Sequence, residues 1–193
     1  HVFPMDRAKT RSEVRDATKS WSRTLVQKWN GTPVYAGLII GRPYVRNTRM
    51  LTVRSTDLRS LVYARYPFGE NSYWEDEPNN IPGRLAITSK SLTAAFATVM
   101  QQGMIGPSGG ADYALRINLP STTTSGPFTT VYENYHFQKC ADIFDELQAM
   151  EGGPNSELAP KLNGSGKLEW DARIGALTGD SFDWDLSDPD CPV

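Results

Sequence analysis

The sequence predicts an α+β fold that is rich in strands, with antiparallel sheets or small β-barrels and a few packed helices. Two apolar runs flank Asn30-Gly31, which is a strong short-range signal of a β-hairpin. A second hairpin is indicated by the apolar runs on either side of Asn163-Gly164-Ser165-Gly166. Between the two, residues 90–102 place apolar side chains at helical spacing, which predicts an amphipathic helix packed against the sheets.

The first expected element is a helix over residues 6–20, with Asp6 as its N-cap. Its apolar face is thin and its polar face is strongly basic. Because such a helix buries little of its own surface, we expect it to lie on a partner or to pack loosely. We therefore name four of its cations as candidate subunit-interface residues. They are Arg7, Arg11, Arg15 and Lys19.

The remaining elements follow from alternating apolar runs and turn signals. Strands are expected at residues 24–29, 34–40, 50–54, 84–88, 113–119, 128–137, 156–162 and 167–174. Helices are expected at residues 56–65, 90–102 and 139–150, with Gly103 ending the second of them. A loop rich in Pro, Asn and acidic residues covers 67–83.

The order of these elements suggests four segments. They are a basic N-terminal helix at 1–20, a first β-rich subdomain with helices at 21–110, a second β-rich subdomain with one helix at 111–180, and an acidic, Pro-containing tail or linker at 181–193. The chain begins at His1, without Met, so we expect a segment of a longer protein or a processed chain. No apolar run approaches the roughly 18 residues that span a membrane, and no membrane insertion is expected.

Charge is unevenly distributed along the chain. Residues 1–65 carry 13 Lys and Arg against 4 Asp and Glu, a net charge of +9, whereas the remaining 128 carry 7 against 18, a net charge of −11. This polarity favours head-to-tail docking of copies, or binding of an anionic partner by the first third. The plain alternative is that both ends are solvated faces.

A catalytic site is not evident. His136 lies four residues before Cys140, but no nucleophile motif surrounds them, so we expect Cys140 to pack in the core and His136 to lie at a strand end. Cys140 and Cys191 are expected to be free thiols in a reducing compartment, with a single bridge as the alternative. His1, His136, Cys140 and Cys191 lack the spacing of a zinc site.

Two acidic clusters are candidates for catalysis or metal binding. Glu70, Glu75, Asp76 and Glu77 fall in one loop, where a glycosidase-like pair is less expected than a solvated surface. Asp183, Asp185, Asp188 and Asp190 alternate as calcium ligands can, but the Gly and Glu of an EF-hand loop are missing. We expect no catalytic residue, metal or cofactor.

Nucleic-acid binding is a further hypothesis. The basic first third contains Trp21, Trp29, Tyr35 and Tyr44, and a basic groove with stacking platforms has this composition. The cations are dispersed, however, and Trp29 and Tyr35 flank a hairpin turn, where packing is the commoner role.

Two stretches carry a family resemblance. The first is Trp29-Asn30-Gly31-Thr32-Pro33-Val34-Tyr35-Ala36-Gly37-Leu38-Ile39, continuing through Gly41-Arg42 to Arg49-Met50-Leu51-Thr52-Val53-Arg54-Ser55-Thr56-Asp57-Leu58. The second is Glu151-Gly152-Gly153-Pro154-Asn155-Ser156-Glu157-Leu158, then Pro160 and Gly166-Lys167-Leu168-Glu169-Trp170-Asp171-Ala172-Arg173-Ile174-Gly175. Together they resemble the minor tail proteins of long-tailed bacteriophages of actinobacteria, the group similar to the tail-tip or baseplate hub.

The resemblance covers roughly residues 20–65 and 130–175. It implies hub-like β-barrel subdomains, a homotrimeric ring at the tail tip of the virion, and synthesis in the host cytoplasm. The implied partners are the distal tail protein and the tape-measure protein, with DNA only in transit through the lumen. A structural, non-enzymatic subunit is therefore the expected function. A tail-associated cell-wall hydrolase and a nucleic-acid-binding module are the alternatives.

Overall fold

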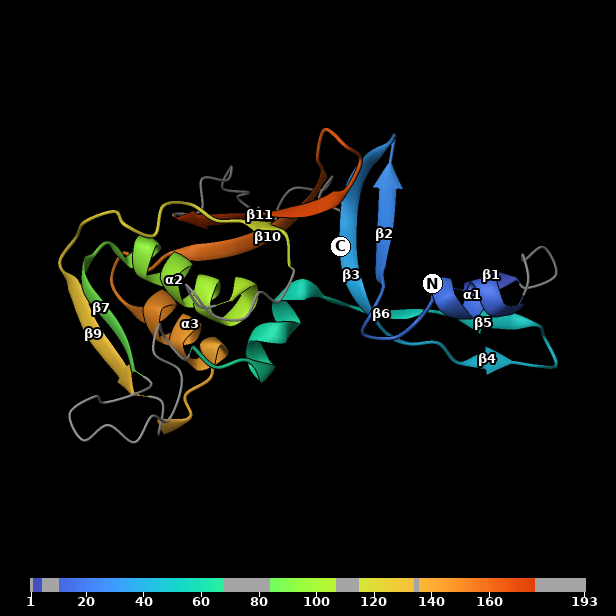
Figure 1. Cartoon of the computed structure of the whole chain (residues 1–193), viewed down its shortest axis with the longest axis horizontal. Helices are drawn as coiled ribbons and strands as arrows, with labels where there is room; N and C mark the ends of the chain where they lie inside the picture. Colours follow the sequence, from blue (N-terminus) through green and yellow to red (C-terminus); the bar gives the residue numbers. More distant parts are fainter. Residues whose placement is uncertain (1, 5–10, 68–83, 107–114, 134–135, 176–193) are drawn as a thin grey trace, which may run out of the picture.

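The computed structural model describes residues 2–4, 11–67, 84–106, 115–133 and 136–175. The fold is mixed α+β and rich in strands, with several small antiparallel sheets, so the predicted class is confirmed. Figure 1 shows a helix-containing part on the left and a strand-rich part that projects to the right. We call them the body, made of the described residues from 58 onward, and the arm, made of 2–4 and 11–57.

The body contains two strand groups and most of the helical structure. Its strands are β7 (Arg84–Lys90), β8 (Ile117–Asn118), β9 (Phe128–Glu133), β10 (Asn155–Leu162) and β11 (Leu168–Gly175). Its helices are the 3₁₀ helix η1 (Leu58–Ala64), α2 (Leu92–Met100), the π-helix η2 (Gln101–Ile105) and α3 (Cys140–Ala149). The strands β7 and β9 pair antiparallel, β10 and β11 form the predicted second hairpin, and β8 adds to β11 in parallel.

A single large core holds the body together. Phe96 of α2 and Phe144 of α3 stack inside it, with ring centroids 4.0 Å apart and an angle of 10° between the rings. Trp170 of β11 and Ile87 of β7 pack in the same cluster, which also includes Ala36 of the arm. The core therefore draws on both sides of the boundary expected at residue 110, and burial of this apolar surface is the main stabilising contribution in the body.

The helix predicted at 90–102 begins two residues later than expected, at Leu92, and the helical structure continues through η2 to Ile105. Ser91 caps α2, its hydroxyl accepting a hydrogen bond from the Ala94 amide at 3.2 Å. The predicted stop at Gly103 is wrong, because the chain continues through η2 to Gly106, whose φ is 135°. Gly103 instead provides close contact, since a Cβ at this position would overlap with Sγ of Cys140. The glycine thus allows η2 and α3 to approach each other.

The arm consists of two three-stranded sheets and one short helix. Its elements are β1 (Val2–Pro4), α1 (Arg11–Ala17), β2 (Thr24–Trp29), β3 (Thr32–Gly41), β4 (Tyr44–Val45), β5 (Met50–Thr52) and β6 (Arg54–Asp57). One sheet has the order β2-β3-β6 and the other β1-β5-β4. The strand predicted at 50–54 is thus two strands in two sheets, because the chain passes from one sheet to the other at Val53.

The arm has a core of its own, which is much smaller than that of the body. Ile39, Leu51 and Val53 are buried there, and Val14 and Leu25 are half-buried against them. Figure 1 shows the β2–β3 hairpin beside β10 and β11, with α1 and the β1-β5-β4 sheet farther from the body. The arm therefore connects to the body mainly through β3, which contacts β10.

Several expected boundaries are corrected. The helix predicted at 6–20 is observed only as α1 and ends at Ala17, while residues 6–10, with Asp6, lie outside the described residues. The predicted strands at 113–119 and 128–137 are observed as β8 and β9, while residues 113–114 and 134–135 lie outside the described residues. The expected loop falls outside the description from residue 68 to 83.

Candidate interaction surface

Two arginines that flank the β2–β3 hairpin connect the helix α1 to the rest of the arm by hydrogen bonds. Arg42 Nη1 donates a hydrogen bond to the carbonyl oxygen of Arg15. Arg23 Nε donates to the carbonyl oxygen of Asp16 at 3.2 Å, and its Nη2 pairs with Asp16 Oδ2 at 3.0 Å. Because the last carbonyls of a helix have no partner within the helix, these cations stabilise its C-terminal end.

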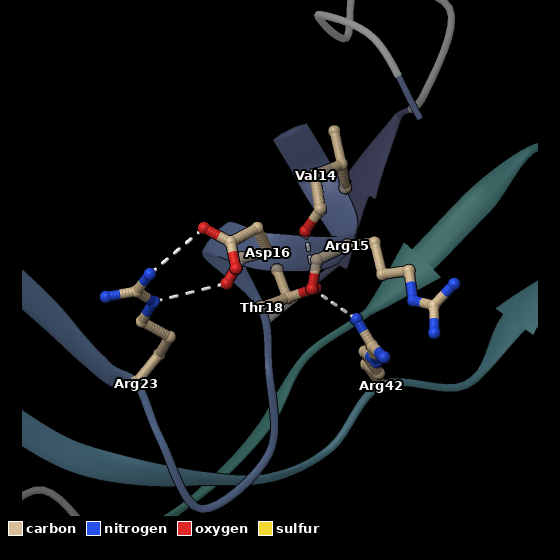
Figure 2. A network of polar contacts seen from close by, with 6 residues as sticks. All are labelled: Val14, Arg15, Asp16, Thr18, Arg23 and Arg42. Carbon is tan, nitrogen blue, oxygen red and sulfur yellow. Dashed lines mark hydrogen bonds and ion pairs between the residues drawn. The ribbon is translucent and has the colours of Figure 1, made fainter. Parts of the chain in front are cut away.

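The two sides of α1 differ in charge (Figure 2). On one side, Asp16 partly neutralises Arg23. On the other, the guanidinium groups of Arg15 and Arg42 lie on the same side of the helix, and neither forms an ion pair with a described residue. We use the name cationic face for Arg15, Arg42 and Lys19, which lies four residues after Arg15 in the chain. Arg15 and Lys19 are exposed, Arg42 is half-buried, and none of the three forms an ion pair with a described residue.

The predicted interface residues have different outcomes. Arg7 lies outside the described residues, and Arg11 is placed only as the first residue of α1. Arg15 and Lys19 are both exposed, although Lys19 follows the end of the helix rather than lying within it. The sequence did not single out Arg42, which directly follows β3 and donates a hydrogen bond to the carbonyl oxygen of Arg15. That contact links positions 27 residues apart, and no local pattern predicts it.

The arm as a whole is basic. Residues 11–57 contain nine Lys and Arg but three Asp and Glu, a net charge of +6. The described residues of the body contain nine Lys and Arg and eight Asp and Glu, a net charge of +1. The positive charge predicted for the first third is therefore displayed on the projecting part of the molecule, and it favours an anionic partner.

Large apolar side chains are also exposed on the arm. Trp29, at the tip of the β2–β3 hairpin, is 72% exposed, and Trp21 is 64% exposed at a residue whose φ is 58°. Tyr44 and Val45 of β4 are exposed as well. The expectation that Trp29 packs is wrong, whereas Tyr35 is half-buried and its hydroxyl bonds with Ser55 Oγ at 3.0 Å. Exposed aromatic side chains are enriched at interaction surfaces.

A shallow hollow of about 300 Å³ marks the junction of arm and body. Tyr35 and Ala36 of β3 line one side, and Ser156 and Leu158 of β10 line the other. Arg59, near the start of the body in η1, also lines the hollow, and its Nη1 donates to the Ser156 carbonyl oxygen of β10 at 3.3 Å. The two stretches that carry the family resemblance thus meet here, although about 100 residues separate them in the sequence.

His136 and Cys140, four residues apart in the sequence, lie in different environments. Cys140 is a free thiol with no exposed surface, and His136 is exposed. Burial raises the pKa of the Cys140 thiol to about 12, so the thiolate that a nucleophile requires is scarce at neutral pH. The prediction that Cys140 packs in the core is confirmed.

The acidic clusters and Cys191, the other candidates from the sequence, lie outside the part of the chain that the structure describes. Glu70, Glu75, Asp76 and Glu77 lie outside it, as do the four alternating aspartates near the C-terminal end and Cys191. Among the described residues, no group of three or more His, Cys, Asp or Glu side chains is placed to hold a metal ion. None of the helices described is both long and apolar enough to cross a membrane.

The chain matches no family model, no curated protein and no solved structure.

Proposed function

We propose that this chain is a structural subunit of a bacteriophage tail tip, whose copies form a hub ring at the distal end of the tail tube. The observation that carries the proposal is the projecting arm, with its cationic face and exposed aromatic side chains. A closed ring built from one kind of subunit needs two different and complementary patches on each copy. The arm provides one patch of distinct charge and composition.

The family resemblance adds the biological setting. The resembling stretches form the arm from the end of β2 to β6 and the β10–β11 hairpin, and they contact each other across the hollow. Because the two stretches pack against each other, the resemblance of both to the same family is consistent with a single folded unit. The proposed ring has three copies, and its neighbours are the distal tail protein and the tape-measure protein.

The proposal predicts an oligomer that is sensitive to salt. Size-exclusion chromatography with light scattering of the full chain should give three times the 21.4 kDa of one copy at about 50 mM salt. Because the arm is basic, the proposed contacts between copies are largely electrostatic. The oligomer should therefore dissociate as salt rises to about 500 mM. A monomer at every salt and protein concentration would contradict the ring.

The nucleic-acid alternative is tested in the same buffers. A fluorescent DNA probe that binds at low salt, while the chain remains monomeric, would favour it over the ring. No observation on the described residues favours the hydrolase alternative, because its named carboxylates lie outside them.

A further inference from the structure

We propose that the arm binds residues 180–188 of a second copy of this chain, an inference that rests on the proposed assembly and names the contact within it. The arm requires a partner more than the body does. Its own core has three buried hydrophobic side chains, while Trp21, Trp29 and Tyr44 remain exposed to water. A small core beside exposed aromatic surface is expected where a contact with another chain completes the packing.

The charge of the arm selects the occupant. Arg15, Lys19 and Arg42 form no ion pair with described residues, so a partner with carboxylates would gain charge-assisted hydrogen bonds from them. The fitting partner therefore combines carboxylates with apolar side chains. The cationic face and the exposed aromatic residues belong to the same arm, so a segment that carries both kinds of side chain matches the composition of the arm.

Residues 180–188 have this composition in an ordered pattern. The segment reads Asp-Ser-Phe-Asp-Trp-Asp-Leu-Ser-Asp, with four acidic residues and no basic one. Phe182, Trp184 and Leu186 alternate with Asp183 and Asp185. In an extended conformation, a period of two directs the apolar side chains to one face and the carboxylates to the other. The acidic run at 70–77 lacks this alternation, since its acids at 75–77 are consecutive.

The segment also starts from a suitable place. The strand β11 ends at Gly175, which pairs with Asn155, and the adjacent Ser156 contacts Arg59 at the junction of arm and body. Phe182 is seven residues further along the chain, a reach of at most about 25 Å when fully extended. Each copy would thus present its own arm to one neighbour and residues 180–188 to the other, which is the head-to-tail arrangement that a ring requires.

The test neutralises the segment in the full chain. Asp183→Asn, Asp185→Asn and Asp188→Asn together should weaken association about tenfold at low salt, as expected from the loss of a few exposed charge pairs. The matched control is Glu70→Gln, Glu75→Gln and Glu77→Gln, which removes the same charge from the rival acidic run and should leave association unchanged. A further variant, Trp184→Ser, should weaken association by a similar factor at every salt concentration at which the unmodified chain still assembles, because it removes apolar contact rather than charge. Sedimentation velocity measures all three against the unmodified chain.

The outcomes separate this inference from the proposed function. If the unmodified chain assembles and the aspartate variant assembles equally well, the inference is wrong and the ring stands. Loss of assembly in the glutamate control alone would assign the contact to residues 70–77 and also overturn it. If the aspartate variant keeps its mass but its arm unfolds more easily, the segment binds within its own chain, which contradicts a contact between copies. If the unmodified chain never assembles, the proposed function fails first.

Discussion

Replacing Phe96 with alanine is expected to lower the free energy of unfolding by about 3–5 kcal/mol, the usual cost of truncating a buried aromatic side chain. Phe96 has no exposed surface, and its ring stacks on Phe144 at the contact of α2 with α3. The loss combines the transfer of the removed atoms with the cavity left between the two helices. Because a whole domain is typically stable by about 5–15 kcal/mol, the variant should be near its unfolding threshold at room temperature.

Urea denaturation followed by circular dichroism measures this effect. Tyr63→Ala is the matched control, because it removes another aromatic ring from a position that is 59% exposed. The control should change stability by no more than about 0.5 kcal/mol. Equal effects of the two substitutions would show that the Phe96–Phe144 stack is not the centre of the core.

Gly103→Ala should destabilise the body by about 1–3 kcal/mol, the range for overpacking a close contact. The sign is informative, since alanine in a helix is ordinarily favoured over glycine by roughly 1 kcal/mol. The reversal arises because a Cβ on Gly103 would overlap with Sγ of Cys140. Removing that sulfur with Cys140→Ala leaves Cys140 Cβ at 3.5 Å, an ordinary contact, so the double variant should recover part of the loss.

A double-mutant cycle in the same denaturation assay quantifies the recovery. We expect a coupling of at least about 0.5 kcal/mol between the two sites, as is found for residues in contact. Gly164→Ala provides the control, because nothing lies within 4 Å of a Cβ at this turn position. Strictly additive effects of Gly103→Ala and Cys140→Ala would contradict the packing of η2 on α3.

Local signals predicted most elements of the fold. Asn30-Gly31 and the Asn163–Gly166 turn both lie between paired antiparallel strands, as expected, and β2 has the bounds expected for its strand. Asn163 explains the second turn in detail, because its Oδ1 accepts hydrogen bonds from the amides of Ser165 and Lys167, each at 3.0 Å. Turn chemistry and periodicity are properties of neighbouring residues, and they can therefore be read from a single sequence.

The errors arise where distant residues decide the structure. A glycine at the end of an apolar helical pattern usually indicates the end of the helix. Gly103 instead lies inside η2, where it allows the close contact with Cys140, 37 residues later in the sequence. The apolar pattern of residues 50–54 predicts a strand without indicating that Val53 separates two sheets. The strand β1, with three residues, is too short for any periodicity to reveal it.

The candidate surface was predicted in part. The basic composition of the first third indicated Arg15 and Lys19, and both are exposed. Arg42 could not be identified, because its bond to the Arg15 carbonyl oxygen joins α1 to the residue that follows β3, 27 positions later in the sequence. The exposure of Trp29 was missed for a similar reason: a residue beside a hairpin turn packs only if another element covers it, and in the described part of the chain none does.

The most direct test of assembly through the arm compares two charge reversals of equal size. Arg15→Glu with Lys19→Glu alters two exposed side chains of the cationic face, while Arg116→Glu with Lys167→Glu alters two exposed side chains of the body. Sedimentation velocity at about 50 mM salt, where screening is weak, gives the mass of each variant. We predict that the arm variant is monomeric, while the body variant and the unmodified chain are trimeric. A trimer that persists in the arm variant would contradict assembly through the arm.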